Sequence, residues 1–178
     1  MNVTNLEKLA RLIKDKERIK KEIASIIGRQ AQLGHVGEYV AAHIFNVKLE
    51  ESASHKGSDG VFKEGPLKNQ SVNIKWYTKR EGLLDINPNG IPDYYLVLTG
   101  PRTVAPSSRG TTRPWVIESV FLFDAKELIK VLEERGVKIG IAASVKLGFW
   151  DDAEIYPKQR DNTLELSDEQ RRLLSLFQ

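Results

Sequence analysis

The stretch from Gly57 to Tyr77 reads GSDGVFKEGPLKNQSVNIKWY, and it decides the fold prediction. Val61 and Phe62 begin a predicted strand, Gly65 to Gln70 is rich in turn-forming residues, and Ser71 to Tyr77 alternates apolar and polar side chains. Because side chains alternate between the two faces of a strand, the return strand has a core face and an opposite face. The core face holds Val72, Ile74 and Trp76, and the opposite face holds Asn73, Lys75 and Tyr77.

A hairpin through this stretch brings distant polar groups together. With the turn centred on Leu67, Asp59 lies across from the segment Asn73 to Lys75. The preceding segment, Gly34 to Asn46, has one apolar side and predicts a helix with Glu38 near its start. That helix can place Glu38 against the same edge of the sheet. We therefore expect two carboxylates, one amide and one ammonium group to meet there.

The rest of the chain predicts further strands and helices. The apolar run Asp93 to Thr99 is typical of a strand buried on both faces, at the centre of the sheet. Other elements are predicted from similar patterns: a strand at Val116 to Phe123, a helix ending near Gly136, a strand at Val137 to Lys146, and a final helix capped by Ser167 with Gln170. Together these elements predict an α/β fold in which a mixed central sheet is flanked by helices.

Composition indicates a single cysteine-free domain over residues 1–178, with a motif-bearing core at 34–100 and C-terminal strands and helices at 115–178. Its hydrophobic content of 40% is enough for a core. Without cysteine, a bound metal would need oxygen or imidazole ligands. Apolar runs too short for a membrane span and a densely charged start predict a cytoplasmic protein without a membrane partner.

The net charge of +3 is local rather than general. Residues 1–29 hold eight Lys or Arg and four Asp or Glu, with apolar residues at helical spacing between them. This pattern predicts an amphipathic helix that Thr4 or Asn5 caps and Gly28 ends. Its basic residues are interpreted as a solvated face, with a DNA-binding face as the alternative. The helix is also the candidate element for a homodimer.

The converging polar groups are those that metal-dependent phosphodiester hydrolysis requires. Magnesium prefers hard oxygen ligands, and a nearby Lys can orient the attacking water or stabilise negative charge. Asp59 is the expected direct ligand, Asn73 a neutral ligand, and Glu38 a ligand directly or through water. Lys75 is the expected catalytic cation, and Mg²⁺, or Mn²⁺ in its place, the cofactor. The alternative is structural: a turn at Asp59, a solvated strand face at Asn73 and Lys75, and a helix-start charge at Glu38.

The order of these residues over about Gly34 to Gly100 resembles the PD-(D/E)XK nuclease superfamily. In that family a helical Glu precedes an acidic residue at a strand start, and an acidic residue, any residue and Lys follow on the next strand. Glu38, Asp59 and Lys75 match this pattern. The resemblance implies a restriction endonuclease-like core and a magnesium-dependent DNA endonuclease, with a restriction-type enzyme as the first expectation.

Two positions depart from the family pattern. Ser58 stands where the name-giving Pro would be, and Asn73 stands where the family has Asp or Glu. Asn73 removes a negative charge from the expected metal site. The alternative is therefore a nuclease-fold module without catalysis that binds nucleic acid or a protein partner.

Further cations and the histidines complete the set of candidates. Tyr77, Lys79 and Arg80 combine an aromatic ring with positive charge near Lys75, which suits contact with a nucleic-acid backbone. The segment from residue 101 to 114 predicts an exposed mobile loop that contacts DNA phosphates through Arg102, Arg109 and Arg113. The histidines are interpreted as a surface residue (His35), a packed and hydrogen-bonded residue (His43) and a loop residue (His55), with a place at the site or on a phosphate as their alternative.

Overall fold

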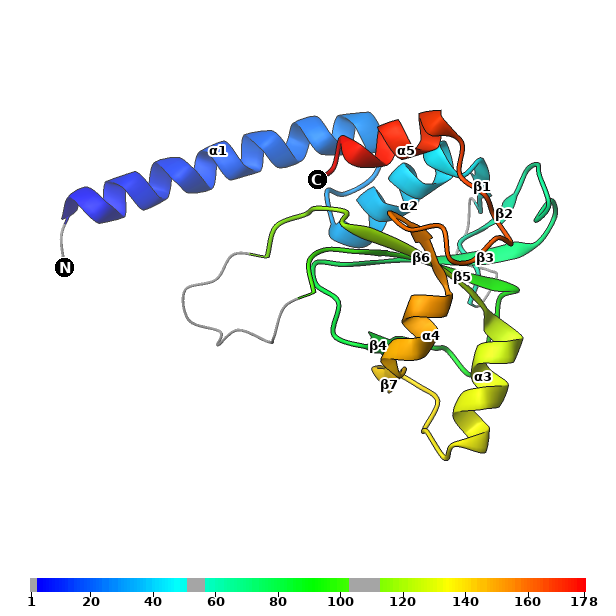
Figure 1. The fold of residues 1–178 in the computed structure, drawn as a ribbon. Coiled ribbons are helices and arrows are strands. Elements are labelled where there is room, and N and C mark those ends of the chain that lie inside the picture. The colour runs from blue at the N-terminus through cyan, green and yellow to red at the C-terminus, as the bar shows by residue number, and fades with distance from the viewer. Residues whose placement is uncertain (1–2, 51–56, 103–112) are drawn as a thin grey trace.

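The computed structural model describes residues 3–50, 57–102 and 113–178. It shows a mixed α/β fold in which helices cover both faces of a central sheet, as predicted (Figure 1). The helices are α1 (Val3–Ile27), α2 (Leu33–Ile44), α3 (Ala125–Glu134), α4 (Leu147–Asp152) and α5 (Asp168–Ser175). The strands are β1 (Val47–Leu49), β2 (Gly60–Phe62), β3 (Ser71–Tyr77), β4 (Leu83–Leu84), β5 (Tyr94–Thr99), β6 (Ser119–Asp124), β7 (Ala143–Ser144) and β8 (Glu154–Tyr156).

The main sheet has the order β1-β2-β3-β5-β6-β8, and β4 pairs with β7 in a separate small sheet. The pair β3 and β5 is parallel, with Val72 opposite Tyr94 and Tyr77 opposite Thr99, while the other neighbours are antiparallel. The apolar strand β5 therefore lies inside the sheet between β3 and β6, which confirms the prediction for residues 93–99.

Each face of the sheet packs its own apolar core. On one face, Val72, Ile74 and Trp76 of β3 pack with α2 and α5, as the alternation predicts. On the other face, β5 and β6 pack with α3 and α4, around Trp150. Figure 1 shows the two pairs of helices on opposite sides of the strands. Because α3 and α4 cover this second face, the polar side chains of β3 that point to it lie in a half-buried environment rather than in open solvent.

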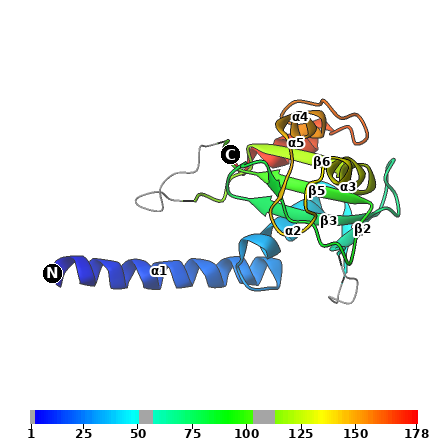
Figure 2. The same ribbon diagram turned by 90° about the horizontal axis from the view of Figure 1, so that it is seen from below.

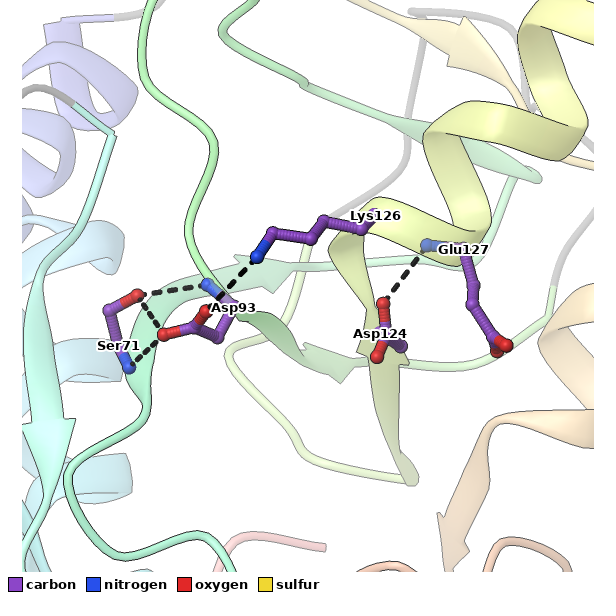
Figure 3. Close-up of polar contacts among 5 residues, drawn as sticks. All are labelled: Ser71, Asp93, Asp124, Lys126 and Glu127. Atoms are coloured by element: carbon purple, nitrogen blue, oxygen red, sulfur yellow. Dashed lines mark hydrogen bonds and ion pairs between the residues drawn. The ribbon is translucent and has the colours of Figure 1, made fainter.

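Hydrogen bonds through Ser71 and Asp93 fasten the start of β3 to the start of β5 (Figure 3). Asp93 Oδ2 accepts from the Ser71 backbone N–H at 2.8 Å and from the Ser71 hydroxyl at 2.7 Å. These bonds hold the pKa of Asp93 below its ordinary value, because they stabilise the carboxylate form. In the same view Asp124 caps α3 by accepting from the Glu127 N–H. Both contacts lie at the opposite end of β3 from Tyr77.

The register of the β2–β3 hairpin corrects one prediction. Gly60 pairs with Val72 and Val61 with Ser71, so the turn centres on Pro66 rather than Leu67. Asp59 still lies across from the predicted segment Asn73 to Lys75, because its backbone N–H donates to the Val72 carbonyl and its carboxylate accepts from the Ile74 N–H. The shift arises because the turn folds on itself, with the Asn69 N–H donating to the Phe62 carbonyl and φ of Asn69 at 68°.

Several elements differ from their predicted form. The segment 137–146 is mostly irregular and forms only the two-residue strand β7. The β6 strand starts at Ser119, because Val116 accepts from the Trp76 indole and Ile117 donates to Phe177 instead of pairing in the sheet. Thr4 and Asn5 lie inside α1 rather than at its cap. The sequence patterns did not predict four short elements, which are β1, β4, α4 and β8.

Other boundaries are as predicted. The α1 helix ends before Gly28, which adopts φ +70°, and α3 ends before Gly136 in the same conformation. Ser167 and Gln170 form the predicted capping box of α5. Among the residues that the structure describes, no helix is long and apolar enough to cross a membrane.

Candidate active site

Asp59 is held at the open end of the β2–β3 ladder. Its N–H donates to the Val72 carbonyl at 2.9 Å, and its Oδ2 accepts from the Ile74 N–H at 2.6 Å. Pairing between β2 and β3 ends at Gly60 and Val72, so beyond Val72 the edge of β3 that faces away from β5 has no strand partner among the described residues. The carboxylate of Asp59 therefore takes the place that a strand carbonyl would have, at the point where the sheet opens.

The loop that leads to Asp59 is tightly constrained. Gly57 has φ +93° and lies so close to Gly90 that a Cβ there would overlap the Gly90 carbonyl. The Ser58 hydroxyl donates to the Gly60 carbonyl at 3.0 Å and lies 3.4 Å from the Val72 carbonyl. Ser58 thus fixes the turn through the hydrogen bonds of its hydroxyl group.

Burial raises the pKa of Asp59 above its ordinary value. The hydrogen bond from Ile74 lowers this pKa, the charge of Glu38 raises it, and the charges of Lys75 and Arg29 lower it. The charges of Glu38, Lys75 and Arg29 therefore all act on the Asp59 carboxyl group. Burial outweighs the favourable partners, so the carboxylate form of Asp59 is poorly solvated, and a further cation beside it would stabilise it.

Asn73 is buried, with 8% of its surface exposed, and lies one residue before Ile74 on β3. Its Oδ1 has no hydrogen-bond partner within the part of the chain that the structure describes. Across the β3–β5 pair it faces Tyr95, whose buried hydroxyl likewise has no partner there. A buried oxygen without a donor is costly, so Asn73 Oδ1 needs a ligand, water or cation to satisfy it. The alternative of a solvated strand face is wrong for Asn73.

Glu38 is positioned by the close approach of α2 to β3. At Gly37 a Cβ would lie 3.0 Å from the Trp76 Cβ, so only glycine allows the helix this near the strand. Glu38 lies on α2, on the opposite face of the sheet from Asn73 and Lys75, yet its charge acts on Asp59.

Arg29 is a site residue that sequence reasoning missed. It follows the Gly28 turn at the end of α1, and its guanidinium forms an ion pair with the Glu38 carboxylate. Its charge also acts on Asp59. Nothing in the local sequence signals this role, because it depends on how the chain turns between α1 and α2. One of the two carboxylates at the site thus already has a cationic partner.

The chemistry of the donor set fits a magnesium site with few protein ligands. The Asp59 carboxylate binds the N–H of Ile74, and the neighbouring residue Asn73 has a side-chain oxygen with no partner among the described residues. Mg²⁺ binds through one or two carboxylates while keeping several waters. A cage of three or more His, Cys, Asp or Glu side chains is not found among the residues described. Glu38 would contribute through water or after exchange of Arg29. The half-buried Lys75 lies two residues after Asn73 on the same face of β3.

The residues predicted to contact nucleic acid near β3 have internal partners. The Tyr77 hydroxyl accepts from the Asp85 N–H at 3.0 Å, and burial raises the Tyr77 pKa above its ordinary value. Lys79 forms a 2.5 Å ion pair with Glu81, and the Arg80 guanidinium lies 5.4 Å from the Phe121 ring centroid. Tyr77 thus supports the β4 connection rather than presenting its hydroxyl to a ligand.

The remaining candidates lie away from this cluster or outside the described residues. Arg102 and Arg113 are exposed at the two ends of the predicted loop, while Arg109 lies outside the described residues, as does His55. His35 Nδ1 bonds to the Gln30 carbonyl at 3.0 Å. His43 is hydrogen-bonded as predicted, with Nδ1 2.7 Å from the Tyr39 carbonyl. Its ring centroid lies 4.1 Å from that of Tyr39, although the residue as a whole is exposed.

A separate pocket of about 380 Å³ lies between α3 and α4. Its lining combines apolar side chains with the carboxylates of Asp124, Glu127, Asp152 and Asp161. Four carboxylates repel a polyphosphate backbone, so this pocket does not suit a nucleic acid. The candidate cluster at the open edge of β3 is therefore the better place for phosphate chemistry.

Comparison with models of known protein families gives no match for this chain, and comparison with curated protein sequences gives none either.

Proposed function

We propose that this chain is a magnesium-dependent DNA endonuclease of the PD-(D/E)XK superfamily, with its active site at Glu38, Asp59, Asn73 and Lys75. The observation that carries the proposal is that the desolvated Asp59 carboxylate binds the Ile74 N–H, one residue along β3 from Asn73, whose buried side-chain oxygen has no partner among the described residues. Neither group forms an ion pair within the part of the chain that the structure describes, and both are oxygen ligands of the type that magnesium prefers.

In hydrolysis, the oxygen of a water forms a new bond to phosphorus while the bond to the leaving ester oxygen breaks. The water gives up a proton to solvent, the leaving oxygen takes one from solvent, and the products are a phosphate monoester and an alcohol. Magnesium would supply Lewis-acid polarisation of the phosphate and of the attacking water. Asp59 and Asn73 would hold it there.

The chain's own cation has a distinct part in this reaction. Lys75 acts as a positive charge beside the carboxylates, able to orient the water and to stabilise charge on the phosphoryl oxygens. Glu38, close to Asp59 and paired with Arg29, can accept a hydrogen bond from that water once Arg29 binds phosphate instead. Arg29 would then be a substrate-binding residue.

Two observations favour a second candidate function. Asn stands at position 73, where the family pattern has Asp or Glu, and Glu38 forms an ion pair with Arg29. A site with one carboxylate fewer than the family pattern, and with its Glu neutralised by Arg, suits a nuclease-fold module that binds nucleic acid or a protein without cleaving. Plasmid cleavage separates this candidate from the enzyme.

The test compares Lys75→Ala with Lys63→Ala on supercoiled plasmid with Mg²⁺ or Mn²⁺. Lys63 is an exposed lysine just after β2 and serves as the matched control for lost charge. We expect Lys75→Ala to lower the cleavage rate by about 10²-fold or more and Lys63→Ala to change it little. Equal activity in both variants contradicts the assigned site. Metal-independent DNA binding without cleavage by the unaltered chain supports the binding module.

A further inference from the structure

The long helix α1 exposes a continuous apolar stripe. Figures 1 and 2 show α1 extending away from the rest of the molecule, which it meets near its C-terminal end. The exposed residues are large and aliphatic, with 47% to 67% of their surface accessible. They are Leu6, Leu9, Leu12, Ile13, Ile19 and Ile26. Soluble monomers rarely expose so much contiguous apolar surface, and patches of this kind mark interaction sites.

The stripe has the spacing of a helix that packs along another helix. With Leu9 at heptad position a, Lys16 and Ile23 occupy the following a positions. Leu12, Ile19 and Ile26 occupy the d positions, so five of the six seam positions are apolar. The 25 residues of α1 span about 38 Å at 1.5 Å per residue, which accommodates three heptads.

We propose that α1 binds α1 of a second copy of this chain, forming a parallel two-stranded coiled coil. In a parallel pair, a g residue of one helix faces the e residue five positions later in the other. Asp15 at g then faces Lys20 of the second copy at e, and the two-fold axis repeats this pair of opposite charges. In the single chain, Lys20 forms an ion pair with Glu17 of its own helix at 3.2 Å. Because exposed ion pairs contribute little to stability, Lys20 can leave Glu17 and pair with Asp15 of the second copy.

The antiparallel arrangement is electrostatically unfavourable. Full overlap of the two stripes places Leu9 opposite Ile26 of the second copy, and g positions then face g positions. Asp15 would meet Glu22 of the second copy, and the symmetry repeats this like-charge contact. Like charges side by side at a helix interface are destabilising. The charge pattern therefore selects the parallel orientation.

Lys16 supports a two-stranded seam. A single Lys at an a position specifies register and oligomer state at some expense of stability. In a two-stranded coil its ammonium group can reach solvent beside the seam while its methylenes pack on Ile19. A second copy matches the stripe in length and charge without a further partner. The short seam and its Lys predict a dimer that dissociates on dilution.

The first test measures mass by sedimentation velocity on the full chain from about 1 to about 200 µM, because dimerisation depends on protomer concentration. We expect a reversible monomer–dimer equilibrium for the unaltered chain. Ile19→Glu at the seam should weaken dimerisation at least tenfold, while Lys14→Glu at the outward f position should not. A monomer at every concentration, or a dimer insensitive to Ile19→Glu, overturns the proposal. Since both positions are exposed, circular dichroism should show both variants folded.

The second test determines orientation and the identity of the paired charges. The chain has no cysteine, so Leu12→Cys introduces a unique thiol at a d position. A parallel coil brings the two copies of this thiol together, and oxidation should yield a disulfide-linked dimer; no cross-link overturns the parallel arrangement. Asp15→Lys and Lys20→Asp should each weaken self-association, whereas an equimolar mixture should form heterodimers. If the mixture associates no better than either variant alone, the assigned charge pairs are wrong.

Discussion

Ile74 donates its backbone N–H to Asp59 Oδ2 at 2.6 Å, across the last pairing of β2 with β3. This bond does two things at once. It satisfies a backbone donor that would otherwise be left on the open edge of β3, and it holds the carboxylate beside Asn73. Asp59 is therefore part of the sheet's hydrogen bonding as well as of the candidate site. A substitution of Asp59 can act through the lost hydrogen bond or through the lost negative charge, and an experiment must distinguish the two.

Asp59→Asn separates the effect of the charge from that of the hydrogen bond, because an amide oxygen can still accept from the Ile74 N–H while the charge is lost. The folded-state pKa of Asp59 is raised by burial, so its protonated form is favoured by folding. The stability that the protonated form contributes is present below the ordinary pKa of 3.8 and is lost as the pH rises through the higher folded pKa. We expect the free energy of unfolding of the unaltered chain to fall relative to Asp59→Asn between pH 4 and neutral pH. Urea denaturation at a series of pH values measures this difference.

The same pair of proteins gives a metal-dependent control. Magnesium stabilises the carboxylate form, so it should reverse the loss of stability in the unaltered chain and have little effect on Asp59→Asn. At 100 times the dissociation constant the expected gain is about 2.7 kcal/mol. Equal stabilisation of both proteins by Mg²⁺ would place the metal elsewhere.

Asn73→Asp places a second carboxylate at the proposed magnesium site. A hard anionic ligand should lower the magnesium concentration needed for half-maximal binding by about an order of magnitude. Without metal the variant should be less stable, because a second buried carboxylate beside Asp59 has no cation. Isothermal titration with Mg²⁺ measures the first effect and urea denaturation with a chelator the second. An unchanged magnesium affinity would show that Asn73 is not a ligand.

Gly37→Ala tests whether the close approach of α2 to β3 positions Glu38 at the site. The added Cβ meets the Trp76 Cβ at 3.0 Å, and because Trp76 is anchored in the sheet, the helix must shift outward. We expect a loss of about 1–3 kcal/mol in stability and a weaker affinity for Mg²⁺. The matched control is Gly34→Ala on the same helix, where a Cβ has no neighbour within 4 Å. That change should be neutral or stabilising by up to about 1 kcal/mol, so similar losses in both variants would contradict the packing argument.

Arg102 and Arg113 test the proposed phosphate contacts of the 101–114 segment. Both are exposed, so replacing them with Ala should leave stability within about 0.5 kcal/mol. Each lost phosphate contact should reduce the slope of log affinity against log salt by up to about 0.9 for duplex DNA. Fluorescence anisotropy at several salt concentrations measures the slope, with Lys130→Ala on α3 as the exposed-cation control. An unchanged slope in the double variant would remove this segment from the DNA interface.

Sequence periodicity by itself determined most of the elements that carry the site. The alternation of Ser71–Tyr77 gave both the strand and the correct core face, and the apolar run of β5 marked the sheet interior, because burial on one or two faces leaves a direct imprint on residue order. The Ser167 capping box was readable for the same reason, since its hydrogen bonds join neighbours in sequence. These features depend on local chain geometry alone.

Tertiary structure alone decided what depends on contacts between distant segments. The Arg29–Glu38 ion pair requires the turn between α1 and α2, and the burial of Asn73 requires a second layer over the face of β3 that alternation marks only as polar. Short strands such as β1 and β8 form because a neighbouring strand offers hydrogen bonds, not because three residues carry a periodic signal. The pKa of Asp59 is the clearest case: its carboxyl group is specified by sequence, but its desolvation is set by how the whole domain packs around it.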